Sequence, residues 1–167
     1  MMKFGATDTM HVEESPQEIL DAIQLIVLQH QSEFARIWQS ILLELGKEKI
    51  HLVNEKELNR EQIDFVNNFF DEEVRSNVIP LMIESIPSLP YLRDKSVYLA
   101  VVMSKKNVAY KRKYALIEVP TRAVSRFVLL PDGKSGEKYI ILLEDVIRFC
   151  LPRIFSYFEY EEFTAHV

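Results

Sequence analysis

The chain has 167 residues, which suffices for one domain or for one domain and part of another. Hydrophobic residues make up 48% and charged residues 27%, as in an ordinary soluble folded protein, and the formal net charge of −5 argues against a dedicated nucleic-acid-binding protein. The sequence has no run of about 18 uncharged apolar residues that could form a transmembrane segment, and no signal peptide, so we expect a cytoplasmic location.

A long helix is predicted after an irregular lead-in. Ser15 can cap its N-terminus, Pro16 suits the first helical position and Glu18 can complete a capping box. Gly46 lies where a C-terminal cap belongs, which gives a helix of about 30 residues, or about 45 Å. Apolar residues recur along this segment at helical spacing: Ile19, Ile23, Ile26, Val27, Phe34, Ile37, Trp38, Ile41 and Leu45.

The rest of the chain predicts a second helix, then four strands, and then a third helix. The second helix begins at Asn59, with Gln62 placed for another capping box, and ends before Pro80. Four strand-like runs follow with short gaps, which favour antiparallel neighbours: SVYLAVVMS, YALIEVP, RFVLLP and KYIILL. LLEDVIRFCLPRIF then returns to helical spacing, and SYFEYEEFTAHV weakly favours a further strand. The predicted fold class is therefore α+β: a long helix and a second helix followed by an antiparallel meander sheet with a helix after its fourth strand.

The triplet Gly133-Lys134-Ser135 resembles the end of a phosphate-binding loop. The P-loop motif would need a glycine at Val128 and a helix after the lysine, whereas here a β-branched, aromatic run follows. Because Asp132 and Gly133 stand between two apolar runs, the pattern predicts a hairpin turn, with glycine supplying a positive φ.

No catalytic or metal site can be assembled from the sequence. His11, His30, His51 and His166 lack the mutual spacing and the cysteine neighbours of a metal site. The single cysteine, Cys150, has no disulfide partner and lies in an apolar run, where it is expected to be a core residue.

One basic segment is a candidate for binding a polyanion. Five cations surround a predicted strand turn at Asn107: Lys105, Lys106, Lys111, Arg112 and Lys113. They could attract a phosphate chain through charge-assisted hydrogen bonds. The alternative, which we favour, is a solvated hairpin tip whose lysines discourage edge pairing.

Several blocks of the chain resemble bacterial polyphosphate kinases, both in their residues and in the order in which they follow one another. The blocks are IHLVNEKELNREQIDFVNNFF, YLAVVM, YALIEVP, RFVLLP and YIILLEDVIRFCLPRIF, and the resemblance extends from about Ile19 to the last residue. It implies that residues 1–48 are the end of an N-terminal helical domain and residues 49–167 the first part of the head, or middle, domain. In that family the head domain is implicated in dimer contacts.

The resemblance also implies where the chemistry lies. The parent enzyme transfers the terminal phosphate of ATP to inorganic polyphosphate and uses ATP and magnesium. Its nucleotide-associated motif lies upstream, and its phosphate-accepting histidine belongs to C-terminal domains, so none of the histidines here inherits that role. We therefore expect a non-catalytic segment without a cofactor, whose partners are the remaining kinase domains, a second copy of the chain and polyphosphate. The alternative is a stand-alone polyanion-binding or protein-interaction module.

Overall fold

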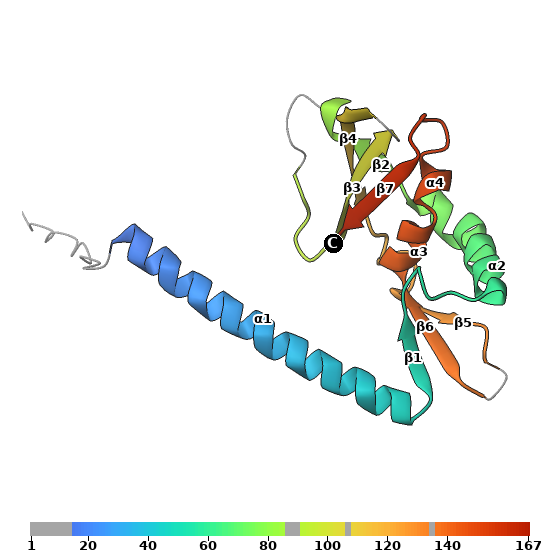
Figure 1. The fold of residues 1–167 in the computed structure, drawn as a ribbon, viewed down its shortest axis with the longest axis horizontal. Helices are drawn as coiled ribbons and strands as arrows, with labels where there is room; N and C mark the ends of the chain where they lie inside the picture. Colours follow the sequence, from blue (N-terminus) through green and yellow to red (C-terminus); the bar gives the residue numbers. More distant parts are fainter. Residues whose placement is uncertain (1–14, 86–90, 106–107, 134–135) are drawn as a thin grey trace, which may run out of the picture. The chain divides into compact units, whose positions relative to one another are not determined.

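The computed structural model describes residues 15–85, 91–105, 108–133 and 136–167, and it forms two compact units with the boundary between Glu44 and Leu45 (Figure 1). The predicted irregular lead-in and four residues singled out in the sequence, Lys106, Asn107, Lys134 and Ser135, lie outside the described residues.

The first unit contains most of the helix α1 (Pro16–Lys47), which has 32 residues and none that is buried; residues 45–47 of this helix belong to the second unit. The predicted capping box is confirmed: the Ser15 backbone N–H donates to the Glu18 carboxylate at 2.7 Å, and the Glu18 N–H donates to the Ser15 hydroxyl at 3.2 Å. The prediction for Gly46 is wrong, because this glycine is still helical and the positive φ of 60° falls on Lys49.

The second unit contains a three-stranded sheet built from β1 (Ile50–Val53), β5 (Phe127–Leu130) and β6 (Lys138–Leu142), in the order β1-β6-β5. β6 is antiparallel to β5 but parallel to β1, with Ile50 opposite Lys138. The predicted turn between β5 and β6 is confirmed, although Gly136 rather than Gly133 has the positive φ of 73°. A Cβ at Gly133 would lie 3.0 Å from the Tyr139 ring and 3.2 Å from the Glu137 carboxylate, so a larger residue there would have to displace these side chains by a few tenths of an ångström.

A four-stranded antiparallel sheet contains β2 (Pro80–Met82), β3 (Tyr98–Lys105), β4 (Val108–Glu118) and β7 (Glu162–His166), in the order β2-β4-β3-β7. The weakly favoured strand in the tail is thus confirmed as β7. Alternate residues of β3, such as Leu99, Val101 and Met103, are buried, whereas Ala100 and Val102 face the other side.

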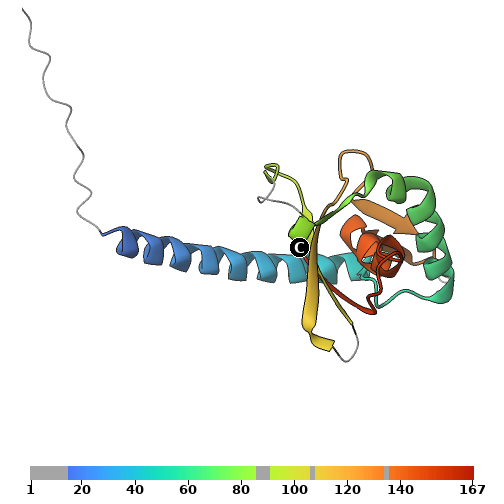
Figure 2. The same ribbon diagram turned by 90° about the horizontal axis from the view of Figure 1, so that it is seen from above.

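Helices cover one face of this four-stranded sheet (Figure 2). The first is α2 (Arg60–Phe69), which continues as the π-helix η1 (Phe70–Val74) and the 3₁₀-helix η2 (Arg75–Asn77). The others are α3 (Leu143–Phe149) and α4 (Leu151–Ile154). A further 3₁₀-helix, η3 (Ile83–Ser85), follows β2. The capping box of Asn59 and Gln62 at the start of α2 is confirmed. Among the described helices, none combines the length and the hydrophobicity that crossing a bilayer requires.

The fold class α+β, with a long helix, a second helix and a helix after the fourth predicted strand, is confirmed. The strands do not form one meander, however, because the first two predicted runs are in the four-stranded sheet and the last two in the three-stranded sheet. The core between the helices and the sheets includes Val66, Phe70, Val74, Leu99, Val101, Met103, Ile117, Ile141, Leu143, Ile147, Cys150, Leu151 and Phe155, all at most 1% exposed.

A buried carboxylate lies beside this core. The Glu144 side chain is 4% exposed and accepts from both the Nε and an Nη of Arg126, whose side chain is 43% exposed. The carboxylate is thereby compensated by a bidentate partner that reaches it from the surface.

Candidate functional site

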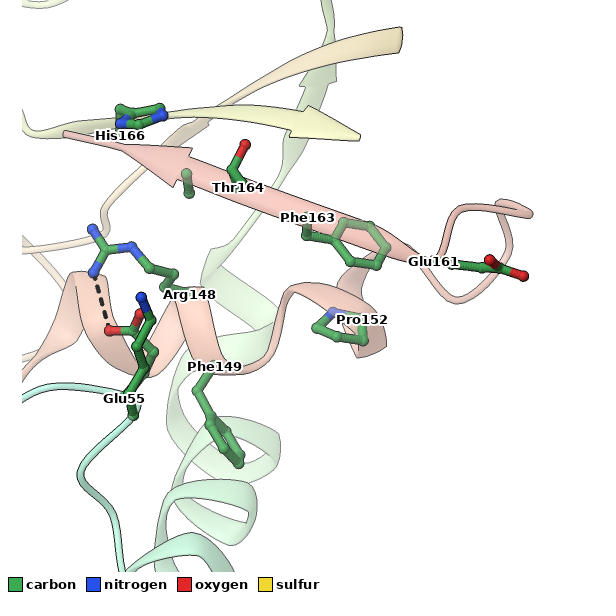
Figure 3. Close-up of a pocket in the computed structure, with 10 residues that line it drawn as sticks. Glu55, Arg148, Phe149, Pro152, Glu161, Phe163, Thr164 and His166 are labelled. Carbon is green, nitrogen blue, oxygen red and sulfur yellow. Dashed lines mark hydrogen bonds and ion pairs between the residues drawn. The ribbon is translucent and has the colours of Figure 1, made fainter. Parts of the chain in front are cut away.

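A groove of about 650 Å³ runs between β7 and α3 (Figure 3). One wall is formed by β7, with Phe163, Thr164, Ala165 and His166, and by Glu161 just before it. The opposite wall is formed by Arg148, Phe149 and Pro152 from α3 and α4. Glu55 and Lys56, from the segment after β1, complete this opposite wall. Arg148 extends from α3 toward the strand, whereas Thr164 and His166 point away from the helix (Figure 3). The groove therefore follows one edge of the four-stranded sheet.

The wall opposite β7 is held by an ion-pair network around Arg148. The Arg148 guanidinium contacts Asp145 and lies 3.4 Å from the Glu55 carboxylate, 93 residues away in the chain. The three side chains are only 21%, 13% and 16% exposed, respectively. Burial raises the pKa of Asp145, and the neighbouring Arg148 opposes this shift. The Arg148 guanidinium thus already has two carboxylate partners.

The strand β7 has one side against the core and one toward solvent. Phe163 and Ala165 are half-buried and pack against the core, and the Phe163 ring stacks on Phe155 with 5.9 Å between centroids. Glu162, Thr164 and His166 alternate with them and are exposed. The exposed set lies on the face of the sheet that the helices of this unit do not cover.

The predicted basic cluster is partly described. Lys105 donates to Glu159 at 2.8 Å, and this hydrogen bond raises the pKa of Lys105. Lys113 lies opposite Met103 and is half-buried, on the core side of β4. Arg112 is exposed on the other side, where a hollow of about 370 Å³ is lined by Val102, Ser104, Arg112, Glu162, Thr164 and His166.

The structure therefore does not gather the described cations at one point. Lys105 has an acidic partner, and Arg112 and Lys113 project from opposite faces of the same strand. Lys106 lies outside the described residues, and so does the side chain of Lys111.

Other chemically reactive side chains have structural roles. The His51 ring stacks on Tyr139 at 5.3 Å, and its Nε2 lies 4.0 Å from Glu137. Cys150 is buried in the core as predicted, and burial raises the pKa of its thiol to about 11, so it is a protonated core residue at neutral pH. Within the described ranges, no three His, Cys, Asp or Glu side chains come together as a metal site would require.

Sequence reasoning missed the groove along β7. Two of its charged residues, Glu55 and Arg148, come from distant segments, and no local motif links them. The available signal was the alternation EFTAH, which identified a strand but did not indicate that this strand would lie at the edge of a sheet.

The comparisons with known proteins all indicate the same family. Residues 61–167 match the family model described as the polyphosphate kinase middle domain. The polyphosphate kinase of Vibrio cholerae is 35% identical over 153 residues, which are 90% of this chain and 21% of that protein. That of Escherichia coli K12 is 33% identical over 153 residues, covering 90% and 22%.

A solved structure agrees in fold. The crystal structure of polyphosphate kinase from Porphyromonas gingivalis superposes with a TM-score of 0.78 and 28% sequence identity, over 89% of this chain and 23% of that one. The chain thus spans about a fifth of the length of these relatives. With more than half of its residues matching the middle-domain model, the chain belongs to the polyphosphate kinase family.

Proposed function

We propose that the chain is a non-catalytic scaffold segment of a polyphosphate kinase, an enzyme that transfers the terminal phosphate of ATP to inorganic polyphosphate. The observation that supports this proposal is the match of residues 61–167 to the middle domain, in a chain that spans about a fifth of its relatives. In this proposal residues 1–48 are the end of the N-terminal helical domain, and residues 49–167 are the first part of the head domain. ATP and magnesium then bind to other parts of the enzyme.

The scaffold role rests on two kinds of surface. The helix α1 exposes many large apolar side chains, among them Phe34 at 69% and Leu43 at 70%. An apolar surface of this kind is typical of a contact with another part of a protein, here the remaining kinase domains. The second unit has a closed core of its own and offers the groove and an edge strand as further contact surfaces. The proposed contacts include contacts between two copies of the chain, which would form a homo-oligomer.

The first experiment is a phosphate-transfer assay. The chain is produced in a host that lacks its own polyphosphate kinase and is incubated with ATP, magnesium and polyphosphate. We expect no transfer from the chain alone, while the full-length Escherichia coli enzyme in the same buffer elongates the polymer. Transfer that copurifies with the chain through two independent columns would contradict the scaffold role.

A second candidate function is polyanion binding by Lys105, Lys106, Lys111, Arg112 and Lys113. The observation in its favour is that Arg112 is exposed in a hollow beside the hydroxyl groups of Ser104 and Thr164. Polyphosphate binding is measured at low and high salt for the double variant Lys111→Glu with Arg112→Glu. The matched control, Lys56→Glu with Arg60→Glu, changes the net charge equally on a different surface. A loss of salt-sensitive binding only in the first variant would favour this function, and equal binding by both would refute it.

A further inference from the structure

The helix α4 lies beside the end of the helix that runs through α2, η1 and η2 (Figure 1), and a small pocket lies between them. Its volume is about 210 Å³, and it shares no lining residue with the groove along β7. The guanidinium groups of Arg75 and Arg153 form its polar side, so we call it the two-arginine pocket. The rest of its lining is apolar or aromatic: Phe70, Val78, Pro80, Ile154 and Tyr157.

The backbone of this helix has an uncommon form at the pocket. In η1 the helix is a π-helix, and the Arg75 backbone N–H donates to the Phe70 carbonyl, five residues back. A single turn of π-helix within a longer helix is rare and often occurs at a functional site. The pocket therefore lies where the local structure itself indicates a site.

Arg153 reaches the π-helical turn from α4 and is held there by several contacts. Its Nη1 donates to the side-chain oxygen of Asn67 at 2.9 Å, and its guanidinium lies over the Phe70 ring, 5.7 Å from the centroid. Its Nη2 donates to Asp71 at 2.5 Å. The guanidinium has more N–H groups than these acceptors use, so it can still donate into the pocket. A ligand would meet a donor that is already in place, which lowers the entropy cost of binding.

The polar side of the pocket has a surplus of positive charge. Asp71 is shared by the two arginines, since its carboxylate also lies 3.5 Å from Arg75 Nη1. The hydrogen bond from Arg153 lowers the pKa of Asp71, so this carboxylate is ionised at neutral pH. Two cations and one anion leave one positive charge. The other acids of this turn, Glu72 and Glu73, are exposed and are not among the residues that line the pocket.

This charge balance favours a singly charged acid. A carboxylate neutralises the remaining positive charge and can accept parallel N–H donors from a guanidinium. A phosphate monoester carries about −1.5 to −2 charges at neutral pH and would leave an excess of negative charge beside Asp71. Because both arginines already approach the one carboxylate of Asp71, a single acidic group of a ligand can also reach both.

The rest of the lining favours an apolar body next to the acid. Phe70 and Val78 are buried in the core, and Ile154 packs against it, so this wall is apolar and fixed. Tyr157 is 92% exposed, and its ring is free to cover a ligand from the solvent side. The volume is below the range of about 300–1,000 Å³ for sites of drug-sized molecules, so it suits a body of about one ring.

We propose that the two-arginine pocket binds a small aromatic monocarboxylate, with the carboxylate between Arg75 and Arg153 and the ring against Phe70, Val78 and Ile154. The proposal does not depend on the scaffold role of the chain. Because the two arginines come from segments far apart in the sequence, the bound acid would also stabilise the folded second unit.

Methyl NMR of the full chain measures both the affinity and the location of binding. Benzoate is the probe, because it combines a carboxylate with one ring; acetate lacks the ring, and benzamide has nearly the same shape without the charge. We expect benzoate to shift the methyl signals of Val78 and Ile154 with a Kd of about 1 mM or tighter, and acetate and benzamide to bind about tenfold more weakly. An affinity for benzoate no higher than that for acetate or benzamide would overturn the proposal. Tighter binding of phenyl phosphate than of benzoate would also overturn it, because the pocket would then not select a single negative charge.

Variants of Arg75 separate this site from general attraction of anions. Arg75→Gln removes one guanidinium and should weaken benzoate binding by about tenfold, whereas Arg75→Lys retains the charge without the planar donor pair and should weaken it by about threefold. The matched control Arg60→Gln removes an equal charge from the exposed start of α2 and should leave the affinity unchanged. The Arg75 side chain is 58% exposed and has Asp71 as its one described partner, so we expect its variants to retain the circular dichroism spectrum of the parent chain. Unchanged affinity in Arg75→Gln, or an equal loss in Arg60→Gln, would refute the assignment.

Discussion

Truncation of Phe155 should destabilise the second unit more than other single aromatic changes in its C-terminal segment. The Phe155 side chain is 0% exposed, and its ring contacts Phe163 at 5.9 Å and Phe158 at 6.0 Å between centroids. Replacing a fully buried phenylalanine by alanine removes the burial of the ring and leaves a cavity, which costs about 3–5 kcal/mol in free energy of unfolding. Because Phe155 links the end of α4 to β7, we expect a value near the middle of this range, about 4 kcal/mol.

Urea unfolding followed by circular dichroism measures the effect. With a slope of about 2 kcal/mol per molar urea, the midpoint of the second unit should fall by about 2 M. The only tryptophan, Trp38, lies in α1, so its fluorescence reports the first unit and should not change. Tyr157, two residues away and 92% exposed, provides the matched control: Tyr157→Ala should alter the free energy by no more than about 0.5 kcal/mol. A Phe155→Ala loss below about 1 kcal/mol, or an equal loss in Tyr157→Ala, would refute the reasoning.

Three further outcomes are expected. Asn59→Ala removes the acceptor for the Gln62 backbone N–H at 3.0 Å and should cost about 1 kcal/mol in urea unfolding, whereas Asn59→Gly should cost only a few tenths. Arg126→Ala leaves the Glu144 carboxylate buried without its partner; we expect a loss of about 2 kcal/mol, less than for a fully buried pair because Arg126 is partly exposed, and the double variant with Glu144→Leu should recover most of it. Cys150 should react with a thiol reagent at pH 8 only as fast as the unit opens, so that mild urea accelerates labelling; rapid labelling of the native chain would contradict its burial.

The local structure of the helices could be predicted because its causes are local. Ser15 with Glu18 and Asn59 with Gln62 satisfy backbone donors within three residues, so the sequence pattern contains the whole interaction. The end of α1 was misplaced because Gly46 tolerates helical dihedral angles, while Lys49 takes up the left-handed conformation that ends the segment. A glycine permits such a conformation but does not require it.

The arrangement of the strands in sheets could not be predicted from the alternation of apolar and polar residues along each strand. A period of two identifies a strand and its faces, but it does not identify the neighbour. The segment of residues 119–126 turns the chain from the four-stranded sheet to the three-stranded sheet, although its length suits an antiparallel connection. Likewise, the pairing of Glu55 with Arg148 depends on the assembled fold and has no local signal.

The parallel pairing of β1 with β6 has a consequence for the order of folding. Ile50 is opposite Lys138, so the three-stranded sheet closes a loop of about 90 residues, which carries a high entropy cost and favours late formation. The β3–β4 hairpin and the capped helix α2 depend on nearer contacts and can form earlier. During synthesis at about 5–20 residues per second, the partner strand β6 is made about 4–18 s after β1. The first strand of this unit to be made is thus stabilised only after most of the unit has been synthesised.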